Sequence, residues 1–180
     1  MPPGGNRRRT FIALGSNLGD RIANCLEAVR RISETGDVET IRLSSPYETE
    51  PAGIVSDKLF INAVLEVRTS LDPEVLLDLL LKIEQQMGRD RAAGPDRTID
   101  LDILFMEGII TASGHTKAGK VDLPHPGAGE RAFVLMPWAE LAPDLVIEPW
   151  KKTVRQMLGG LPSMHPVLRR VSWEPERTQP

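Results

Sequence analysis

The most constraining stretch of the sequence is Ile99-Asp100-Leu101-Asp102-Ile103, in which apolar residues alternate strictly with two aspartates. Alternation with a period of two predicts a β-strand that has one buried face. Asp100 and Asp102 then project from the same face, about 7 Å apart along the strand. The sequence therefore predicts a pair of carboxylates held on one side of a sheet.

Two carboxylates held this close repel each other unless a cation lies between them. Mg²⁺ prefers hard oxygen ligands and usually takes one or two carboxylates together with substrate phosphates. Three arginines lie just upstream, and their guanidinium groups suit phosphate oxygens: Arg89, Arg91 and Arg97. We predict a Mg²⁺–polyphosphate site beside an arginine-bearing loop. The alternative is a solvated outer strand face, but aspartate is depleted in strands and the arginine loop favours a site.

Length and composition limit the class of protein. A chain of 180 residues with 41% hydrophobic and 26% charged residues is typical of one soluble globular domain. The formal net charge of −3 argues against a nucleic-acid partner, because such surfaces are basic. No apolar run approaches the roughly 20 residues of a membrane span. The single cysteine, Cys25, fits a core position in a protein of the reducing cytoplasm.

The spacing of apolar residues predicts the order of the elements. We expect strands over residues 10–14, 38–43, 60–67 and 99–105, and long helices over 21–35 and 72–87. A tight turn over 15–20, long loops over 44–58 and 89–97, and a hairpin or loose loop over 107–120 connect them. Short helices are expected near 136–141 and over 150–158. We expect residues 1–9 to be a flexible lead-in that is not a signal peptide, 10–160 to form the domain, and 161–180 to be a partly ordered tail.

The order strand, helix, strand, strand, helix, strand predicts an α+β fold with a ferredoxin-like βαββαβ core. We expect an antiparallel sheet with both helices on one face and additional C-terminal helices on the other, giving three layers (α/β/α). Phe60 and Asn62 share one face of the third strand. They can bracket a flat heterocycle by stacking and hydrogen bonding. The equal alternative is that Phe60 packs in the core and Asn62 satisfies a nearby loop.

Four motifs follow one another between residues 10 and 158. They are Ala13-Leu14-Gly15-Ser16-Asn17-Leu18-Gly19-Asp20; Ser44-Ser45-x-Tyr47-x-Thr49 with Phe60-Ile61-Asn62-Ala63; Ile83-Glu84-x-x-x-Gly88-Arg89-x-Arg91 running on to Gly94-Pro95-x-Arg97-x-Ile99-Asp100-Leu101-Asp102; and Leu123-Pro124-His125-Pro126 with Glu130-Arg131-x-Phe133. In this order and with these gaps, the chain resembles the 6-hydroxymethyl-7,8-dihydropterin pyrophosphokinase family of the folate pathway.

The resemblance implies transfer of the diphosphate of ATP to the hydroxymethyl group of 6-hydroxymethyl-7,8-dihydropterin, with release of AMP. It implies two Mg²⁺ ions on Asp100 and Asp102, with Arg89 and Arg97 completing the catalytic set, in line with the general chemistry of phosphoryl transfer. Arg91 would help position the pterin and the product. Residues implied around ATP are Glu84, Arg89, Arg91, Arg97, Ile103, His125 and Arg131. Residues implied around the pterin are Thr49, Ala52, Phe60, Asn62 and Phe133. We expect a monomer.

The sequence departs from the family pattern near the substrates. The arginine loop lacks the tryptophan that often precedes Gly-Pro-Arg, and Asp96 stands directly before Arg97. Glu50 occupies a position often held by proline. His125 is followed by residues 126–129, Pro-Gly-Ala-Gly, instead of a bulkier basic segment. These differences predict a weaker lid over the pterin.

Three other interpretations stay open. The same strand order is used by RNA-recognition domains, but those need exposed aromatics and a basic surface, whereas this chain is acidic and 4% aromatic. A Mg²⁺-dependent phosphohydrolase or nucleotidyl-type transferase would use the same aspartate pair without a pterin. An inactive family member is suggested by Asp96 and the missing tryptophan, although both aspartates and both phosphate-binding arginines are present.

Overall fold

The fold is built on one six-stranded antiparallel sheet. The computed structural model describes residues 6–111 and 121–174. The strands of the sheet are β1 (Arg8–Ser16), β2 (Val38–Leu43), β3 (Tyr47–Thr49), β4 (Phe60–Thr69), β5 (Asp100–Met106) and β8 (Val167–Arg170). Their order is β5-β1-β4-β3-β8, and β2 pairs with β4 beside β3. A separate two-stranded sheet joins β6 (Val146–Ile147) to β7 (Lys152–Thr153).

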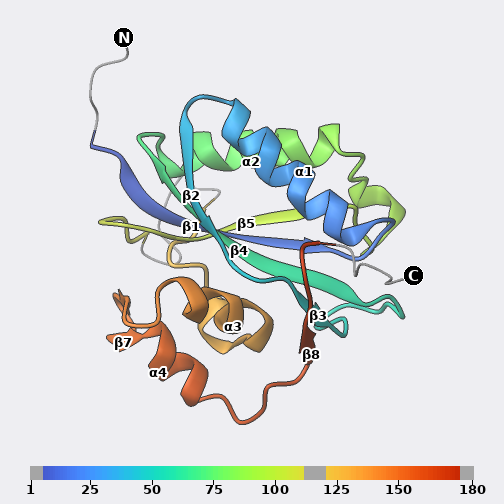
Figure 1. The fold of residues 1–180 in the computed structure, drawn as a ribbon. Helices are drawn as coiled ribbons and strands as arrows, with labels where there is room; N and C mark the ends of the chain where they lie inside the picture. Colours follow the sequence, from blue (N-terminus) through green and yellow to red (C-terminus); the bar gives the residue numbers. More distant parts are fainter. Residues whose placement is uncertain (1–5, 112–120, 175–180) are drawn as a thin grey trace.

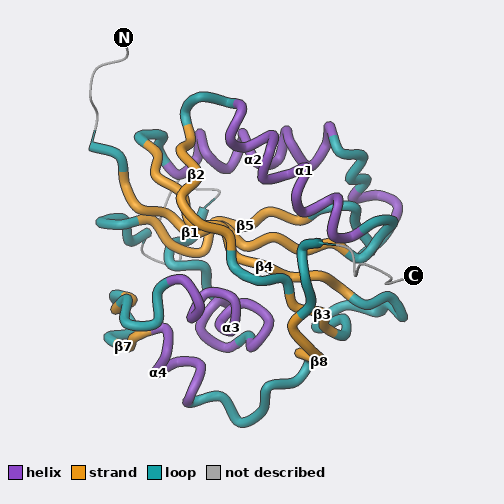
Figure 2. The backbone as a smooth tube through the Cα atoms, viewed as in Figure 1, coloured by secondary structure: helices purple, strands orange, loops and turns teal. Residues whose placement is uncertain are grey.

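Helices cover both faces of the sheet. Helices α1 (Arg21–Glu34) and α2 (Pro73–Gln86) lie on one face, and α3 (Ala132–Leu141) and α4 (Val154–Gly159) lie on the other (Figure 1). Short 3₁₀ helices η1 (Arg91–Ala93) and η2 (Ala128–Glu130) sit in the connections. Figure 2 shows the main sheet as one layer between the two pairs of helices, so the mixed α/β architecture with an antiparallel sheet is confirmed. No helix in the described part of the chain is long and apolar enough to cross a membrane.

Alternation along the central strands divides the core into two halves. Ile12 and Leu65 face the cluster beneath α1 and α2, whereas Phe11 and Val64 face the cluster beneath α3 and α4. Each half buries apolar surface worth about 25 cal/mol per Å². Cys25 of α1 is fully buried in the first half, as predicted, and burial raises the pKa of its thiol to about 12.

The starts of the two long helices follow the sequence signals. The Asp20 carboxylate accepts a hydrogen bond from the backbone N–H of Ala23 at 3.0 Å and so caps α1. Helix α2 begins at Pro73, directly after Asp72, as the sequence predicts, although Asp72 makes no side-chain cap bond. Gly15 was expected in the turn before α1 but lies inside β1, which extends to Ser16.

The C-terminal third differs most from the predictions. Helix α3 begins at Ala132 rather than near residue 136. The sequence did not reveal this start because the sheet and α4 both cover the helix, so its apolar residues show no one-sided period. Helix α4 spans only Val154–Gly159, since residues 152–153 form β7. Within the tail that was expected to be partly ordered, residues 167–170 form β8 against β3. Residues 8–9 belong to β1, and most of the expected 107–120 hairpin lies outside the described residues.

Candidate active site

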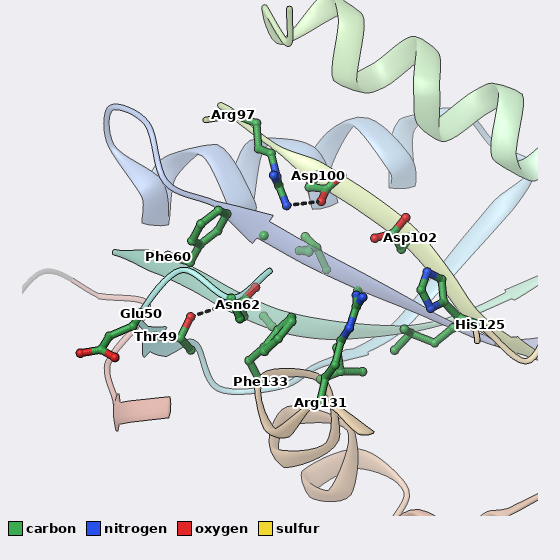
Figure 3. Close-up of a pocket in the computed structure, with 17 residues that line it drawn as sticks. Thr49, Glu50, Phe60, Asn62, Arg97, Asp100, Asp102, His125, Arg131 and Phe133 are labelled. Carbon is green, nitrogen blue, oxygen red and sulfur yellow. Dashed lines mark hydrogen bonds and ion pairs between the residues drawn. The ribbon is translucent and has the colours of Figure 1, made fainter. Parts of the chain in front are cut away.

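One cavity collects most of the residues that the sequence analysis singled out. Its empty volume is about 660 Å³ with the open mouth included. The predicted residues in its lining are Thr49, Ala52, Phe60, Asn62, Arg97, Asp100, Asp102, His125, Arg131 and Phe133 (Figure 3). Four predicted residues do not line it: Glu84, Arg89, Arg91 and Ile103.

The cavity lies over the junction of three strands. Gly15 of β1 is paired with Asn62 of β4 on one side and with Asp100 of β5 on the other. A Cβ atom added to Gly15 would lie 3.0 Å from the Asn62 side-chain oxygen. Gly15 therefore keeps the floor of the cavity open, a role that sequence reasoning missed because the glycine was assigned to the turn.

Asp100 and Asp102 face the same cavity from β5, as alternation predicts. Burial, and after it the charge of Asp100, raises the pKa of the Asp102 carboxyl. Among the described residues, the Asp102 carboxylate makes no hydrogen bond and no ion pair, although its backbone belongs to the β1–β5 ladder. Over residues 6–111 and 121–174, no group of three or more His, Cys, Asp or Glu side chains is arranged to hold a metal. The two carboxylates that line the cavity are a donor set that suits Mg²⁺, which usually takes one or two carboxylates together with substrate phosphates.

Asp100, unlike Asp102, is engaged by two arginines. Arg97 pairs with it at 3.0 Å, and Arg89 donates a hydrogen bond to it from the other side. The Arg97 guanidinium also lies 5.0 Å from the centre of the Phe60 ring. Its Nε is buried and finds no hydrogen-bond partner among the described residues. Because an unsatisfied buried donor is unfavourable, Arg97 is suited to receive an anionic ligand.

Glu84, near the end of α2, binds two arginines of the arginine loop. Its side chain is 2% exposed, and it accepts hydrogen bonds from Arg89 at 2.9 Å, Arg91 at 3.1 Å and the backbone N–H of Leu101 at 2.7 Å. Burial raises the pKa of the Glu84 carboxyl, although the Leu101 N–H and Arg89 lower it. Glu84 thus lies behind the site and joins the end of α2 to the start of β5.

The opposite wall pairs an amide with aromatic rings. Asn62 donates from its side-chain nitrogen to the Thr49 hydroxyl at 2.8 Å, and both groups are buried. Figure 3 shows Asn62, Phe60 and Phe133 around one end of the cavity, with Arg131 and His125 toward the aspartates. The Asn62 oxygen faces Gly15 and is turned toward the cavity. A flat ring with polar edges would fit this wall.

The Asp96 side chain binds residues from other segments of the chain, although Asp96 stands directly before Arg97 in the sequence. Its carboxylate instead accepts hydrogen bonds from Asn17 at 2.8 Å, Ser56 at 2.6 Å and Lys58 at 2.8 Å. The hydrogen bond from Lys58, followed by those from Ser56 and Asn17, lowers the pKa of Asp96 to about 2. These contacts had no local sequence signal, because the partners are 38–79 residues away.

A second hollow adjoins the first across Asp102 and His125. Ile103, Leu77 and Pro126 complete its lining together with Val121 and Asp122. Ile103, which the sequence analysis placed near ATP, therefore lies next to the carboxylate pair but outside the main cavity. The two hollows give Asp102 and His125 access to ligands on both sides.

Comparisons with known proteins agree with this geometry. The family model of 7,8-dihydro-6-hydroxymethylpterin-pyrophosphokinase (HPPK) matches residues 11–143. The chain is 40% identical over 155 residues to the 2-amino-4-hydroxy-6-hydroxymethyldihydropteridine pyrophosphokinase of Methylorubrum extorquens, covering 85% of this chain and 93% of the relative. It is 41% identical over 133 residues to the protein of the same name from Bacillus subtilis, covering 73% and 76%.

Solved structures show the same fold at lower identity. Wild-type Plasmodium falciparum HPPK-DHPS superposes with a TM-score of 0.69 at 15% identity, over 88% of this chain and 42% of that one. An HPPK-DHPS in complex with substrates gives 0.64 at 16% identity, over 85% and 43%. The chain spans less than half the length of these structures. On the family model and the two bacterial relatives, the chain belongs to the 7,8-dihydro-6-hydroxymethylpterin-pyrophosphokinase family.

Proposed function

We propose that this chain transfers the diphosphate of ATP to the hydroxymethyl group of 6-hydroxymethyl-7,8-dihydropterin and releases AMP in folate synthesis. The observation that carries this function is the cavity itself, which brings a carboxylate pair and the partly buried Arg97 together with an amide and two phenylalanines. The family of the chain supports the same reaction.

On the phosphate side, Asp100 and Asp102 would hold two Mg²⁺ ions together with the oxygens of ATP. Bound Mg²⁺ would neutralise the charge that develops on the transferred group. Arg97 would add donors at the same place, supported by its unpartnered Nε. Arg131, which stands 5.9 Å from the Phe133 ring and lines the cavity, would bind a second phosphate.

Arg89 and Arg91 would act from the edge of the site. Arg89 is 11% exposed and fixes Asp100, so its role would be to keep that carboxylate in place and to add positive charge behind it. Arg91 is 63% exposed and can swing toward a ligand, consistent with a role in binding ATP or the product. Glu84 would hold both arginines. His125 and Ile103 would contact the nucleotide in the second hollow.

On the pterin side, Asn62 would exchange hydrogen bonds with the ring edge while Thr49 keeps its amide oriented. Phe60 and Phe133 would stack on the ring, and the backbone of Ala52 would close the pocket. No strong base is required, because positioning and electrostatic stabilisation can supply most of the rate enhancement of such a transfer.

We extend the proposal to the fold and the partners. The strand order β5-β1-β4-β2, with α1 and α2 on one face, supports a ferredoxin-like core. The acidic composition supports small-molecule substrates over nucleic acid. We propose a monomer, since the described residues of a single chain line the whole cavity.

The test is AMP release from ATP and Mg²⁺, with and without the pterin, for the wild type, Asp102→Asn and a control, Asp144→Asn. Asp144 is 81% exposed and lines neither hollow. Pterin-dependent AMP that is lost in Asp102→Asn and retained in Asp144→Asn supports the proposal. Phosphate release without the pterin would indicate a hydrolase, and no AMP at all would indicate an inactive member of the family.

A further inference from the structure

Two loops flank the mouth of the cavity. The pterin loop, residues 50–59, follows β3 and contributes Ala52 to the lining, and the arginine loop, residues 89–97, precedes β5 and contributes Arg97. Within the described residues, the side-chain hydrogen bonds between the two loops meet at Asp96. One Asp96 oxygen accepts from Ser56 at 2.6 Å and the other from Lys58 at 2.8 Å, so both bonds join one loop to the other.

The same carboxylate is fixed to the scaffold. Asn17, between β1 and α1, donates to Asp96 at 2.8 Å. The backbone of Asn17 donates to the Arg97 carbonyl at 3.1 Å, and its side-chain oxygen accepts from the Arg97 N–H at 2.7 Å. Ser56 in turn accepts from the Lys58 N–H at 3.1 Å, which closes a turn in the pterin loop. The network therefore joins three segments through one side chain.

We propose that Asp96 is a positioning residue that fastens the pterin loop onto the arginine loop and so arranges the pterin pocket before either substrate binds. This inference rests on the proposed function, because it assigns the pocket to the pterin. Ordering a loop in advance removes part of the cost that binding otherwise carries. Where a tryptophan would cover the pterin by contact with the ring, this chain would hold the lid by contact between its own loops.

The positions of Asp96 and Lys58 determine which binding and kinetic constants should change. Neither Asp96 nor Lys58 lines the cavity, so neither touches the pterin directly. Losing the tie should therefore weaken pterin binding while the chemical step stays close to the wild-type rate. Hydrogen bonds to a charged group that is partly exposed predict a loss of about three- to tenfold in pterin affinity. Affinity for a nucleotide in the second hollow should change less than twofold.

The experiment compares Asp96→Ala, Asp96→Asn and Lys58→Met with the wild type and with Asp57→Asn. Asp57 is a matched control, because it is an exposed acid in the same loop with no hydrogen bond to the arginine loop in the described structure. Pterin dissociation constants are measured by calorimetry with no nucleotide present, and KM and kcat are measured by AMP release. Melting temperatures check that every variant folds.

The expected result is a raised pterin Kd and KM in Asp96→Ala, an intermediate rise in Asp96→Asn, which keeps an oxygen for Asn17 and Ser56, and no change in Asp57→Asn. Lys58→Met combined with Asp96→Asn should cost less than the sum of the two single changes. The proposal is overturned if Asp96→Ala binds the pterin as Asp57→Asn does, or if only its melting temperature falls. A wild type that produces no pterin-dependent AMP would instead refute the proposed function, whatever the variants do.

Discussion

Removing the Glu84 carboxylate should weaken the protein and the site together. In Glu84→Ala the buried Leu101 N–H loses its side-chain acceptor, which costs about 1–3 kcal/mol. Arg89 and Arg91 lose their shared carboxylate in the same step. Breaking a buried ion pair by removing one partner typically costs about 3–5 kcal/mol. We expect the free energy of unfolding of Glu84→Ala to fall by about this amount, with the lost Leu101 hydrogen bond included.

Glu84→Gln separates the two contributions. The amide oxygen can still accept from the Leu101 N–H, whereas the charge-assisted bonds to the arginines are lost. We expect a decrease of about 1.5–3 kcal/mol in the free energy of unfolding. The matched control is Glu34→Gln, an acid on α1 that is 58% exposed and pairs with Arg30. Its decrease should stay below about 0.5 kcal/mol.

Urea unfolding at pH 7 measures the differences, and in a chain of this length each kcal/mol corresponds to about 2–4 °C in Tm. AMP release should fall about tenfold to 100-fold in Glu84→Ala, because Arg89 would no longer hold Asp100 in place. If Glu84→Ala unfolds within 0.5 kcal/mol of Glu34→Gln, taken as the roughly neutral range for surface changes, the role assigned to Glu84 is wrong.

Three further outcomes follow from buried or paired groups. Because the folded pKa of Asp96 is about 2 against an ordinary 3.8, its contribution to stability is complete above about pH 5 and is lost as the pH falls toward 2; the Tm difference between the wild type and Asp96→Asn, measured from pH 3 to 7, should shrink with acidification. Cys25, fully buried with a pKa of about 12, should not react with a thiol reagent at about pH 8 until urea unfolds the chain. The Trp138 Nε1 is buried with no partner among the described residues, so Trp138→Phe should cost less than about 1 kcal/mol in urea unfolding, whereas Trp138→Ala should cost about 3–5 kcal/mol.

The sequence predicted the strands and helices that have a one-sided apolar pattern. Helix α1 has one face in the core and one exposed to solvent, and β5 has one face in the core and one toward the cavity, so their periods are visible in the residues. Helix α3 is covered from two sides, and its start at Ala132 left no period to read. Residues 167–170 form strand β8 by backbone pairing with β3. Nothing in these four residues alone indicates that they pair with β3.

The same division applies to the site. Asp100, Asp102, Phe60 and Asn62 could be grouped from alternation, because a strand fixes which side chains share a face. The function of Asp96 could not be read in this way. A carboxylate beside Arg97 suggests a local pair, but the chain turns it toward Asn17, Ser56 and Lys58, which meet it only after folding.

The pairing of β8 with β3 also has a consequence for folding during synthesis. Glu48 of β3 and Arg169 of β8 are 121 residues apart and pair at 3.1 Å. At about 5–20 residues per second, a ribosome needs about 6–24 s to travel from one to the other. During that interval β3, which carries Thr49, has β4 on one side and an unpaired edge on the other. Such an edge is a template for association with other nascent chains, so the β3 wall of the cavity stays open to misassociation until β8 has been made.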